Sequence, residues 1–457
     1  FKDTSVASPV TPGITTMNNS GTINLKDGKS AGMYIKNDTD DRTKAVINNL
    51  STSGKINVDK AESVGIMADT ATVQNDGVIN VKDEKSAGIY AIDNSYVTNN
   101  ANITTKDEKS AGIYISDSDV VNNANKTITV DKNKSAGIYG KFKNDKDHTI
   151  TNSGIITLAT SNSEKGSAGI YGELESSATK KLDIANLAGS TINVSMKESV
   201  GIYSNADATK NVVNNGELTL SGKKTLGVFL RGGQTFENKA NINIADSANS
   251  LEPTIGIYTA EGTSNIKHTT GTIEVGEKSI GIYSKTPSSV EMNGGKIHVK
   301  DQGIGIYKED GTVVVKGELD IDKHVATAKD TEPTGVYAVN GATVVDQASK
   351  ITVGEKSYGF ILNNTDPNKT NVYTNTNAGP VSLGNDSVFL YSKGKANITN
   401  NRNINSNNSD HLIGFYVKDG GEFVNNGIID FSTGKGNIGV YAPNGKATNR
   451  GSIVVGP

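Results

Sequence analysis

Apolar residues along this chain occur in short runs that alternate with polar residues. Gly77-Val78-Ile79-Asn80-Val81 is one such run, and similar runs occupy Gly21 to Leu25 and Gly271 to Val275. The runs are rich in Ile, Val, Thr and Tyr and are bounded by Gly, Asn, Asp and Lys, which is typical of short β-strands. No stretch keeps a helical apolar period over the length of a helix. The pattern therefore predicts an all-β protein.

One short phrase repeats along almost the whole chain. Lys85-Ser86-Ala87-Gly88-Ile89-Tyr90 returns at Lys109 to Tyr114 and at Lys134 to Tyr139, and worn copies bring the total to 16. The glycines of the first and last copies, Gly32 and Gly439, lie 407 residues apart over 15 intervals, so the mean period is about 27 residues. A fixed period of this length is typical of a solenoid.

Each period contains three apolar alternations, which we interpret as three strands. The first is the run of the Gly77 to Val81 type, and the second is the repeated Ser-Ala-Gly-Ile-Tyr phrase. The third is an apolar residue followed by any residue and then Asn, as in Val97-Thr98-Asn99. Three strands per turn predict a parallel β-helix, with equal strands of successive coils about 4.8 Å apart. Parallel crossovers are nearly always right-handed. We expect a single right-handed β-helical domain of about 16 coils over residues 1–457, with a lead-in strand or irregular segment at residues 1–15.

Equal positions in successive coils should stack into ladders of like side chains. Strict alternation places Ala87 and Ile89 on the core face of their strand. Gly88 and Tyr90 then share the outer face, where the glycine would let each tyrosine ring lie flat on the sheet. The outer ladder could form an aromatic platform for a ligand, but because it runs the whole length we favour packing between neighbouring rings. The two ladders include Ile89, Ile113 and Ile138 in the core and Tyr90, Tyr114 and Tyr139 outside.

A third ladder consists of asparagines. Asn tolerates a left-handed backbone and suits a coil corner, and stacked amides can hydrogen-bond along the rod. We expect the ladder to begin at Asn18 and Asn48, to lapse from His268 to Thr374 and to resume at Asn400. Its regular part includes Asn75, Asn99 and Asn122.

Composition excludes several classes of function. The formal net charge is −3 and only four residues are Arg, which disfavours binding to nucleic acid through bulk charge. The chain has no Cys, which excludes disulfides and thiolate zinc sites. Five scattered histidines show no spacing for a shared metal. Parallel β-helices can host polysaccharide-cleaving enzymes, but no pair of carboxylates is placed for glycosidase chemistry. We expect no enzyme activity, no cofactor and no metal.

Insertions should leave the rod at two corners of the coil. One set follows the Tyr strand, at residues 36–44 and 141–148 among others, and a second set precedes the Ser-Ala-Gly strand, at residues 160–166, 246–253 and 322–333. Insertions in repeat proteins often collect on a binding face, although tolerated variation in solvated loops is the alternative. The candidate partner-binding residues are Arg42, Lys141, Phe142, Lys143, Lys180, Lys181 and Arg231.

Arrays of Lys-Ser-Ala-Gly-Ile-Tyr that alternate with Asn-Asn-Gly-x-Ile-x-Val resemble the passenger regions of large fusobacterial type V autotransporter adhesins. The resemblance covers about Thr16 to Val455. It implies an extracellular passenger piece at the bacterial surface, held in the parent protein by a C-terminal outer-membrane β-barrel that this chain lacks. It also implies attachment to a host receptor, including immune-cell receptors, to a glycan or to partner bacteria. The alternative is a passive stalk that presents a distal adhesive tip. We expect a monomer, whereas a trimeric autotransporter head would have shorter repeats.

Overall fold

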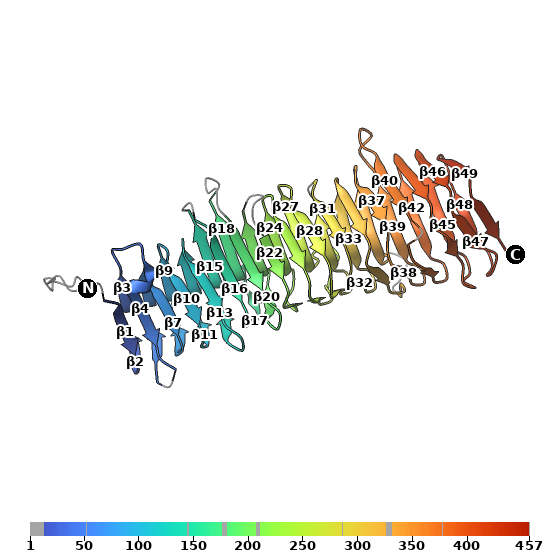
Figure 1. Ribbon diagram of the computed structural model, residues 1–457. Helices are drawn as coiled ribbons and strands as arrows, with labels where there is room; N and C mark the ends of the chain where they lie inside the picture. The colour runs from blue at the N-terminus through green and yellow to red at the C-terminus, as the bar shows by residue number, and fades with distance from the viewer. Residues whose placement is uncertain are drawn as a thin grey trace.

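The chain winds into one long rod. The structure is a computed structural model, and it describes residues 13–51, 53–143, 146–175, 181–206, 211–285, 287–325, 331–376 and 378–456. Figure 1 shows the strands crossing the rod one behind another from the N-terminal to the C-terminal end. In the described residues the elements are 50 strands and one short 3-10 helix, η1 (Arg42–Lys44). Residues 1–12 of the expected lead-in segment lie outside the described residues.

Each coil contributes one strand to each of three parallel sheets, which we name A, B and C. Sheet A contains 17 strands, sheet C contains 16, and sheet B contains 14 and is continued by a sheet of three. All pairings are parallel and join a strand to its equivalent in the next coil, as β9 joins β12. The predicted right-handed parallel β-helix of about 16 coils with three strands per coil is confirmed.

The strands of sheet A end at the asparagine ladder. They are β1 (Thr15–Asn19), β4 (Ala45–Asn49), β7 (Thr72–Asn75), β10 (Tyr96–Asn99), β13 (Asp119–Asn122), β16 (His148–Asn152), β19 (Leu182–Asn186), β22 (Asn211–Asn214), β25 (Thr235–Asn238), β28 (Asn265–His268), β31 (Ser289–Met292), β34 (Thr312–Val315), β37 (Thr343–Asp346), β40 (Asn371–Asn375), β43 (Ala396–Asn400), β46 (Gly421–Asn425) and β49 (Lys446–Asn449).

The strands of sheet B follow directly. They are β2 (Thr22–Leu25), β5 (Lys55–Val58), β8 (Val78–Val81), β11 (Ile103–Thr105), β14 (Thr127–Val130), β17 (Ile155–Lys165), β20 (Thr191–Lys197), β23 (Glu217–Leu220), β26 (Ile242–Ile244), β29 (Thr272–Val275), β32 (Lys296–Val299), β35 (Glu318–Ile321), β38 (Lys350–Val353) and β41 (Val381–Leu383), continued by β44 (Ile404–Asn405), β47 (Ile428–Phe431) and β50 (Ser452–Val455).

Sheet C contains the repeated Ser-Ala-Gly-Ile-Tyr phrase. Its strands are β3 (Ala31–Lys36), β6 (Val64–Asp69), β9 (Ala87–Ile92), β12 (Ala111–Ser116), β15 (Ala136–Phe142), β18 (Ala168–Leu174), β21 (Val200–Asn205), β24 (Leu226–Arg231), β27 (Ile255–Glu261), β30 (Ile280–Ser284), β33 (Ile304–Glu309), β36 (Thr334–Val339), β39 (Tyr358–Asn363), β42 (Val388–Lys393), β45 (Ile413–Lys418) and β48 (Ile438–Tyr441).

The core is a file of apolar side chains that fills the inside of the coils. Ile89 pairs in register with Ile113, and Ile113 pairs with Ile138. All three side chains are completely buried. Stability in such an array comes from contacts between neighbouring coils, so each rung supports the next.

The glycine of the repeat faces the core, which corrects the alternation predicted from the sequence. The paired register runs Ala87 to Ala111 and Ile89 to Ile113 and passes over the glycine. A Cβ on Gly88 would lie 3.1 Å from the Ile103 Cγ2 atom and 2.6 Å from a carbonyl oxygen of the next coil. Gly and Ile therefore both face inward, and Ala and Tyr both face outward. Simple alternation fails because it assumes an unbroken pleat.

One coil shows the same orientation with a large side chain. Phe389 stands at the glycine position of β42, between Val388 and Leu390. Its ring is completely buried. It packs at 5.5 Å between ring centres against both Phe360 and Phe415. The position of the repeat glycine is thus a core position, and in β42 it holds a large side chain.

The asparagine ladder runs one residue away from the predicted register at two places. At the N-terminal end Asn49 pairs with Asn75, and Asn19 pairs with Asn49, so Asn18 and Asn48 lie beside the ladder. At the other lapse the ladder residue is Asn375, not Thr374, because its amide donates to the Asn400 Oδ1 atom at 2.8 Å. At each of these strand ends two adjacent residues could have joined the ladder, so the sequence alone did not determine which one stacks.

The left-handed corner is a different one from the corner that we predicted. Asn75, Asn99 and Asn122 each end an extended strand. The left-handed residue instead precedes the repeat serine: φ is 53° at Lys85 and 54° at Lys109.

No helix among the described residues has the length and apolar character needed to cross a membrane.

Candidate binding groove

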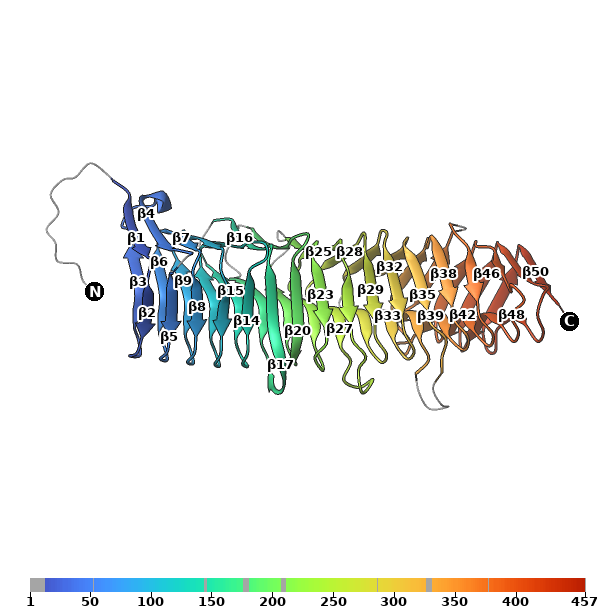
Figure 2. The ribbon, with the colours of Figure 1, turned by 90° about the horizontal axis from the view of Figure 1, so that it is seen from below.

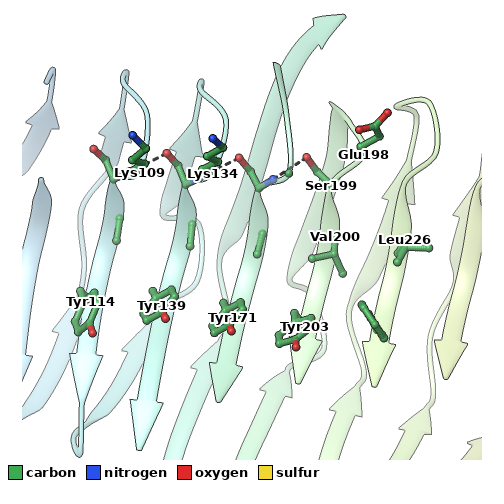
Figure 3. Close-up of a pocket in the computed structure, with 18 of the residues that line it drawn as sticks. Lys109, Tyr114, Lys134, Tyr139, Tyr171, Glu198, Ser199, Val200, Tyr203 and Leu226 are labelled. Atoms are coloured by element: carbon green, nitrogen blue, oxygen red, sulfur yellow. Dashed lines mark hydrogen bonds between the residues drawn. The ribbon is translucent and has the colours of Figure 1, made fainter. Parts of the chain in front are cut away.

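An open groove runs along the outer face of sheet C, parallel to the rod axis. It crosses five coils, from β12 to β24, and has a volume of about 610 Å³. Figure 3 shows tyrosines on one side of it and the turns that carry Lys109 and Lys134 on the other. We call it the tyrosine groove. Its wall is Tyr114, Tyr139, Tyr171, Tyr203 and Phe229, its floor is Ala111, Ala136, Ala168, Val200 and Leu226, and its rim is Lys109, Lys134, Gly166, Glu198 and Lys224 with the serines that follow the first four.

The floor exists because the strand bends at the repeat glycine. With Gly turned inward, the preceding Ala points outward beside the tyrosine and becomes the floor. Ala136 carries only a methyl group there, whereas Leu226 occupies the same ladder position at the other end of the groove. The groove is therefore deepest over its three alanines and becomes shallower toward Leu226.

The wall is a stack of aromatic rings that stand on edge. Tyr139 and Tyr171 have ring centres 4.6 Å apart and planes within 2° of parallel, and Tyr171 and Tyr203 are 4.6 Å apart at 10°. Rings lying side by side on a sheet could not come this close, so they are stacked face to face. The expectation that each ring lies flat is wrong, since stacking at the strand spacing gives better ring contacts. The faces cover one another, and the ring edges form the wall.

Burial raises the pKa of Tyr114, Tyr139 and Tyr171 above the usual tyrosine value. Burial beside neighbouring rings raises the pKa of Tyr114 to about 12. Burial, followed by the carboxylate of Glu173, also raises the pKa of Tyr171, whose hydroxyl donates to the Glu173 Oε2 atom at 3.1 Å. These three hydroxyl groups are neutral at physiological pH, which lies below even the usual tyrosine pKa of about 10.

A serine ladder holds the opposite rim. The backbone N–H of Ser110 donates to the Ser135 Oγ atom at 3.1 Å, and that of Ser135 donates to the Ser167 Oγ atom at 3.2 Å. The N–H of Ser167 continues the series to Ser199 at 3.1 Å. Figure 3 shows these bonds along the top of the groove. They fix the left-handed turns just before them, so the rim side chains are held at coil spacing.

Charge is distributed unequally along the rim. Lys109 and Lys134 form no ion pair with a described residue. Lys224, at the far end, lies 3.6 Å from the Glu198 carboxylate and 2.6 Å from that of Glu252. One end of the groove is therefore cationic, and the charges at the other end neutralise one another.

The groove lies within a region that matches a known family. The family model of the BigA third pectate lyase-like domain matches residues 10–102 and 94–349. The chain belongs to this family. BigA is an autotransporter-like adhesin, so the BigA-type domain is a surface-adhesin type of passenger region. No curated protein and no solved structure matches the chain.

Phe142 is not a loop residue of this BigA-type domain, which corrects a prediction. Strand β15 continues through Phe142, and its completely buried ring stacks on His148 at 4.8 Å between ring centres. A second expected loop, residues 160–166, is mostly strand, because β17 runs to Lys165 and projects beyond its neighbours (Figure 2). Charged residues on both sides of Phe142 concealed an inward position.

The remaining predicted contact residues bind the domain's own side chains or lie apart. The guanidinium of Arg42 donates to the Asp119 Oδ2 atom at 3.0 Å and lies 5.0 Å from the centre of the Tyr96 ring. That of Arg231 pairs with the Glu261 carboxylate at 2.8 Å.

Two of the four predicted contact lysines pair with one carboxylate, and the other two do not. Lys141 and Lys143 converge on Glu175, at 3.5 and 3.3 Å. The backbone N–H of Lys181 donates a hydrogen bond to the Asp147 carboxylate at 2.9 Å. Lys180 lies outside the described residues. On the groove rim, Lys109 and Lys134 form no ion pair with a described residue, and each is the lysine that precedes Ser-Ala-Gly in its repeat.

Proposed function

We propose that this BigA-type domain is an adhesive segment of a bacterial cell-surface passenger, of the fusobacterial autotransporter kind, and that it attaches to a host cell or to another bacterium through the face of sheet C. The observation that carries the proposal is the tyrosine groove, in which an apolar floor lies beside the ammonium groups of Lys109 and Lys134, which form no ion pair with a described residue. Concave, mostly apolar sites with a few polar groups are typical binding sites.

The place of the groove on the rod supports a contact role. It lies on one outer face, and its rim is fixed by backbone hydrogen bonds, so a partner would meet a pre-formed surface. The predicted loop residues Arg42, Lys141 and Arg231 are engaged with acidic neighbours. They are therefore weaker candidates for a first contact.

Filling the groove tests the proposal. Ala136→Leu introduces at the deepest point the residue that Leu226 already places in the same ladder, so the coil should fold. Ile304→Leu is the matched control, because Ile304 occupies this ladder position in β33, outside the groove. Beads coated with the domain should lose attachment to epithelial cells or partner bacteria with Ala136→Leu and keep it with Ile304→Leu. Equal attachment by both variants would favour the passive stalk.

We also propose that the groove is not catalytic. Its lining consists of Tyr, Phe, Ala, Val, Leu, Ser and Gly with three lysines and a single carboxylate, that of Glu198, which is paired with Lys224. Glycoside cleavage needs two carboxyl groups across the bond. A reducing-sugar assay with acidic and neutral polysaccharides should show no release of ends, and release that is lost in Glu198→Gln would contradict this.

A further inference from the structure

The tyrosine groove is chemically different at its two ends. Lys109 and Lys134, one coil apart, lie beside the alanine floor at the end nearer the N-terminus. At the other end the floor consists of Val200 and Leu226, and the ring of Phe229 turns edge-on to Tyr203, at 88°. An occupant complementary to both ends has an anionic head and an apolar tail.

The length of the groove suits a single hydrocarbon chain. Five coils are separated by four steps of about 4.8 Å, so the groove is about 19 Å long. One acyl chain spans about half of a bilayer core, or about 15 Å, which leaves room for a head group beside the lysines. The volume of about 610 Å³ is within the range of small-molecule sites.

Other linear ligands fit the groove less well. A sugar ring binds an aromatic side chain through its flat face, and here the faces of Tyr139 and Tyr171 are covered by neighbouring rings. An extended peptide repeats its side chains about every 6.7 Å on one face, which drifts against the coil spacing. An alkyl chain has no such register and needs only a continuous apolar floor.

We infer that the tyrosine groove binds a long-chain alkyl carboxylate, a monomeric fatty-acid anion, with its head at Lys109 and Lys134 and its tail along Ala136, Ala168 and Val200. The inference rests on the proposed function only in using the same groove. The tyrosine hydroxyls are neutral at physiological pH and do not repel the carboxylate.

Calorimetric titration with sodium alkanoates below their micelle concentrations tests the inference. Each methylene buried on one side should tighten binding about twofold, half the effect of complete burial. Hexadecanoate should therefore bind about 60-fold more tightly than decanoate, with little further gain for longer chains. The methyl ester of hexadecanoate should bind about tenfold more weakly, because it lacks the charge for two exposed ion pairs.

Three variants locate the site. Ala136→Leu should abolish binding of hexadecanoate, and Lys109→Gln with Lys134→Gln should weaken it about tenfold. Lys278→Gln is the matched control, since Lys278 occupies the same left-handed turn, with φ of 56°, outside the groove. Absence of binding, or binding unchanged by Ala136→Leu, would overturn the inference. So would binding of polygalacturonate, polyaspartate or anionic vesicles in place of the monomeric alkanoate.

The two proposals can fail separately. If hexadecanoate does not bind but Ala136→Leu still abolishes cell attachment, the groove is adhesive and its ligand is not a fatty acid. If hexadecanoate binds with the expected chain-length dependence but Ala136→Leu leaves attachment unchanged, the lipid site is real and the adhesive proposal is wrong.

Discussion

The interior amide ladder should contribute strongly to the stability of the rod, and Asn99 is the position at which to measure this. Its side chain is completely buried. Its Oδ1 atom accepts from the Asn75 amide at 2.7 Å, and its own amide donates to the Asn122 Oδ1 atom at 2.8 Å and to the Ala101 carbonyl at 2.8 Å. Asn99→Ala removes these three hydrogen bonds.

The expected loss is large because the former partners cannot reach water. Each hydrogen bond contributes about 1 kcal/mol net. The Asn75 donor and the Asn122 acceptor are also left unsatisfied, at about 1 kcal/mol or more each. We expect Asn99→Ala to lower the free energy of unfolding by about 3–5 kcal/mol. Asn48→Ala is the matched control, since the Asn48 amide donates to the Asn18 Oδ1 atom at an exposed site.

Urea unfolding followed by circular dichroism, with hydrogen exchange resolved by coil, provides the assay. The loss should appear as faster exchange in β7, β10 and β13, because coupling in a solenoid is between neighbouring coils. Asn48→Ala should change the free energy of unfolding by less than about 0.5 kcal/mol. If the two variants have equal stability, the ladder does not contribute as argued.

Four further variants test buried groups, and the urea midpoint of unfolding is measured for each. Burial lowers the pKa of His268 from 6.5 to about 4, so the unfolded chain binds the extra proton between these values. The contribution of His268 is complete above about pH 6.5 and falls by about 3 kcal/mol as the pH drops to 4. His268→Asn should restore the amide ladder beside Asn238 and remove that part of the acid sensitivity, and an unchanged pH profile would contradict it. Arg402 is completely buried and pairs with Asp346 at 2.9 Å, so Arg402→Met should cost about 3–5 kcal/mol. Adding Asp346→Asn should recover much of that loss, and no recovery would show that the uncompensated carboxylate is not the cause. Phe389→Ala should cost about 3–5 kcal/mol through the cavity that it leaves, and a cost below about 1 kcal/mol would mean that the core collapses around it.

The architecture of the rod could be predicted from the sequence because it depends on repetition. A parallel coil pairs each strand with its own copy, so the period, the three strands per coil and the inward Ile89 ladder follow from repeated short-range patterns. The lysines before Ser-Ala-Gly were visible in the same pattern. Their place on a groove rim was not visible, because the groove is formed by five neighbouring coils together.

What the sequence by itself determined was therefore which residues share a ladder. Only the tertiary structure decided which way some ladders face. The strand departs from regular alternation at Gly88, and the preceding alanine therefore faces outward. The departure is possible because glycines in successive coils have no side chain and let their backbones approach closely. The rings of Tyr139 and Tyr171 stand on edge because they stack on each other across coils. Phe142 is buried in the coil interior although its sequence neighbours are charged. Each of these outcomes is set by contact between coils, and a pattern read along one strand carries no record of that contact.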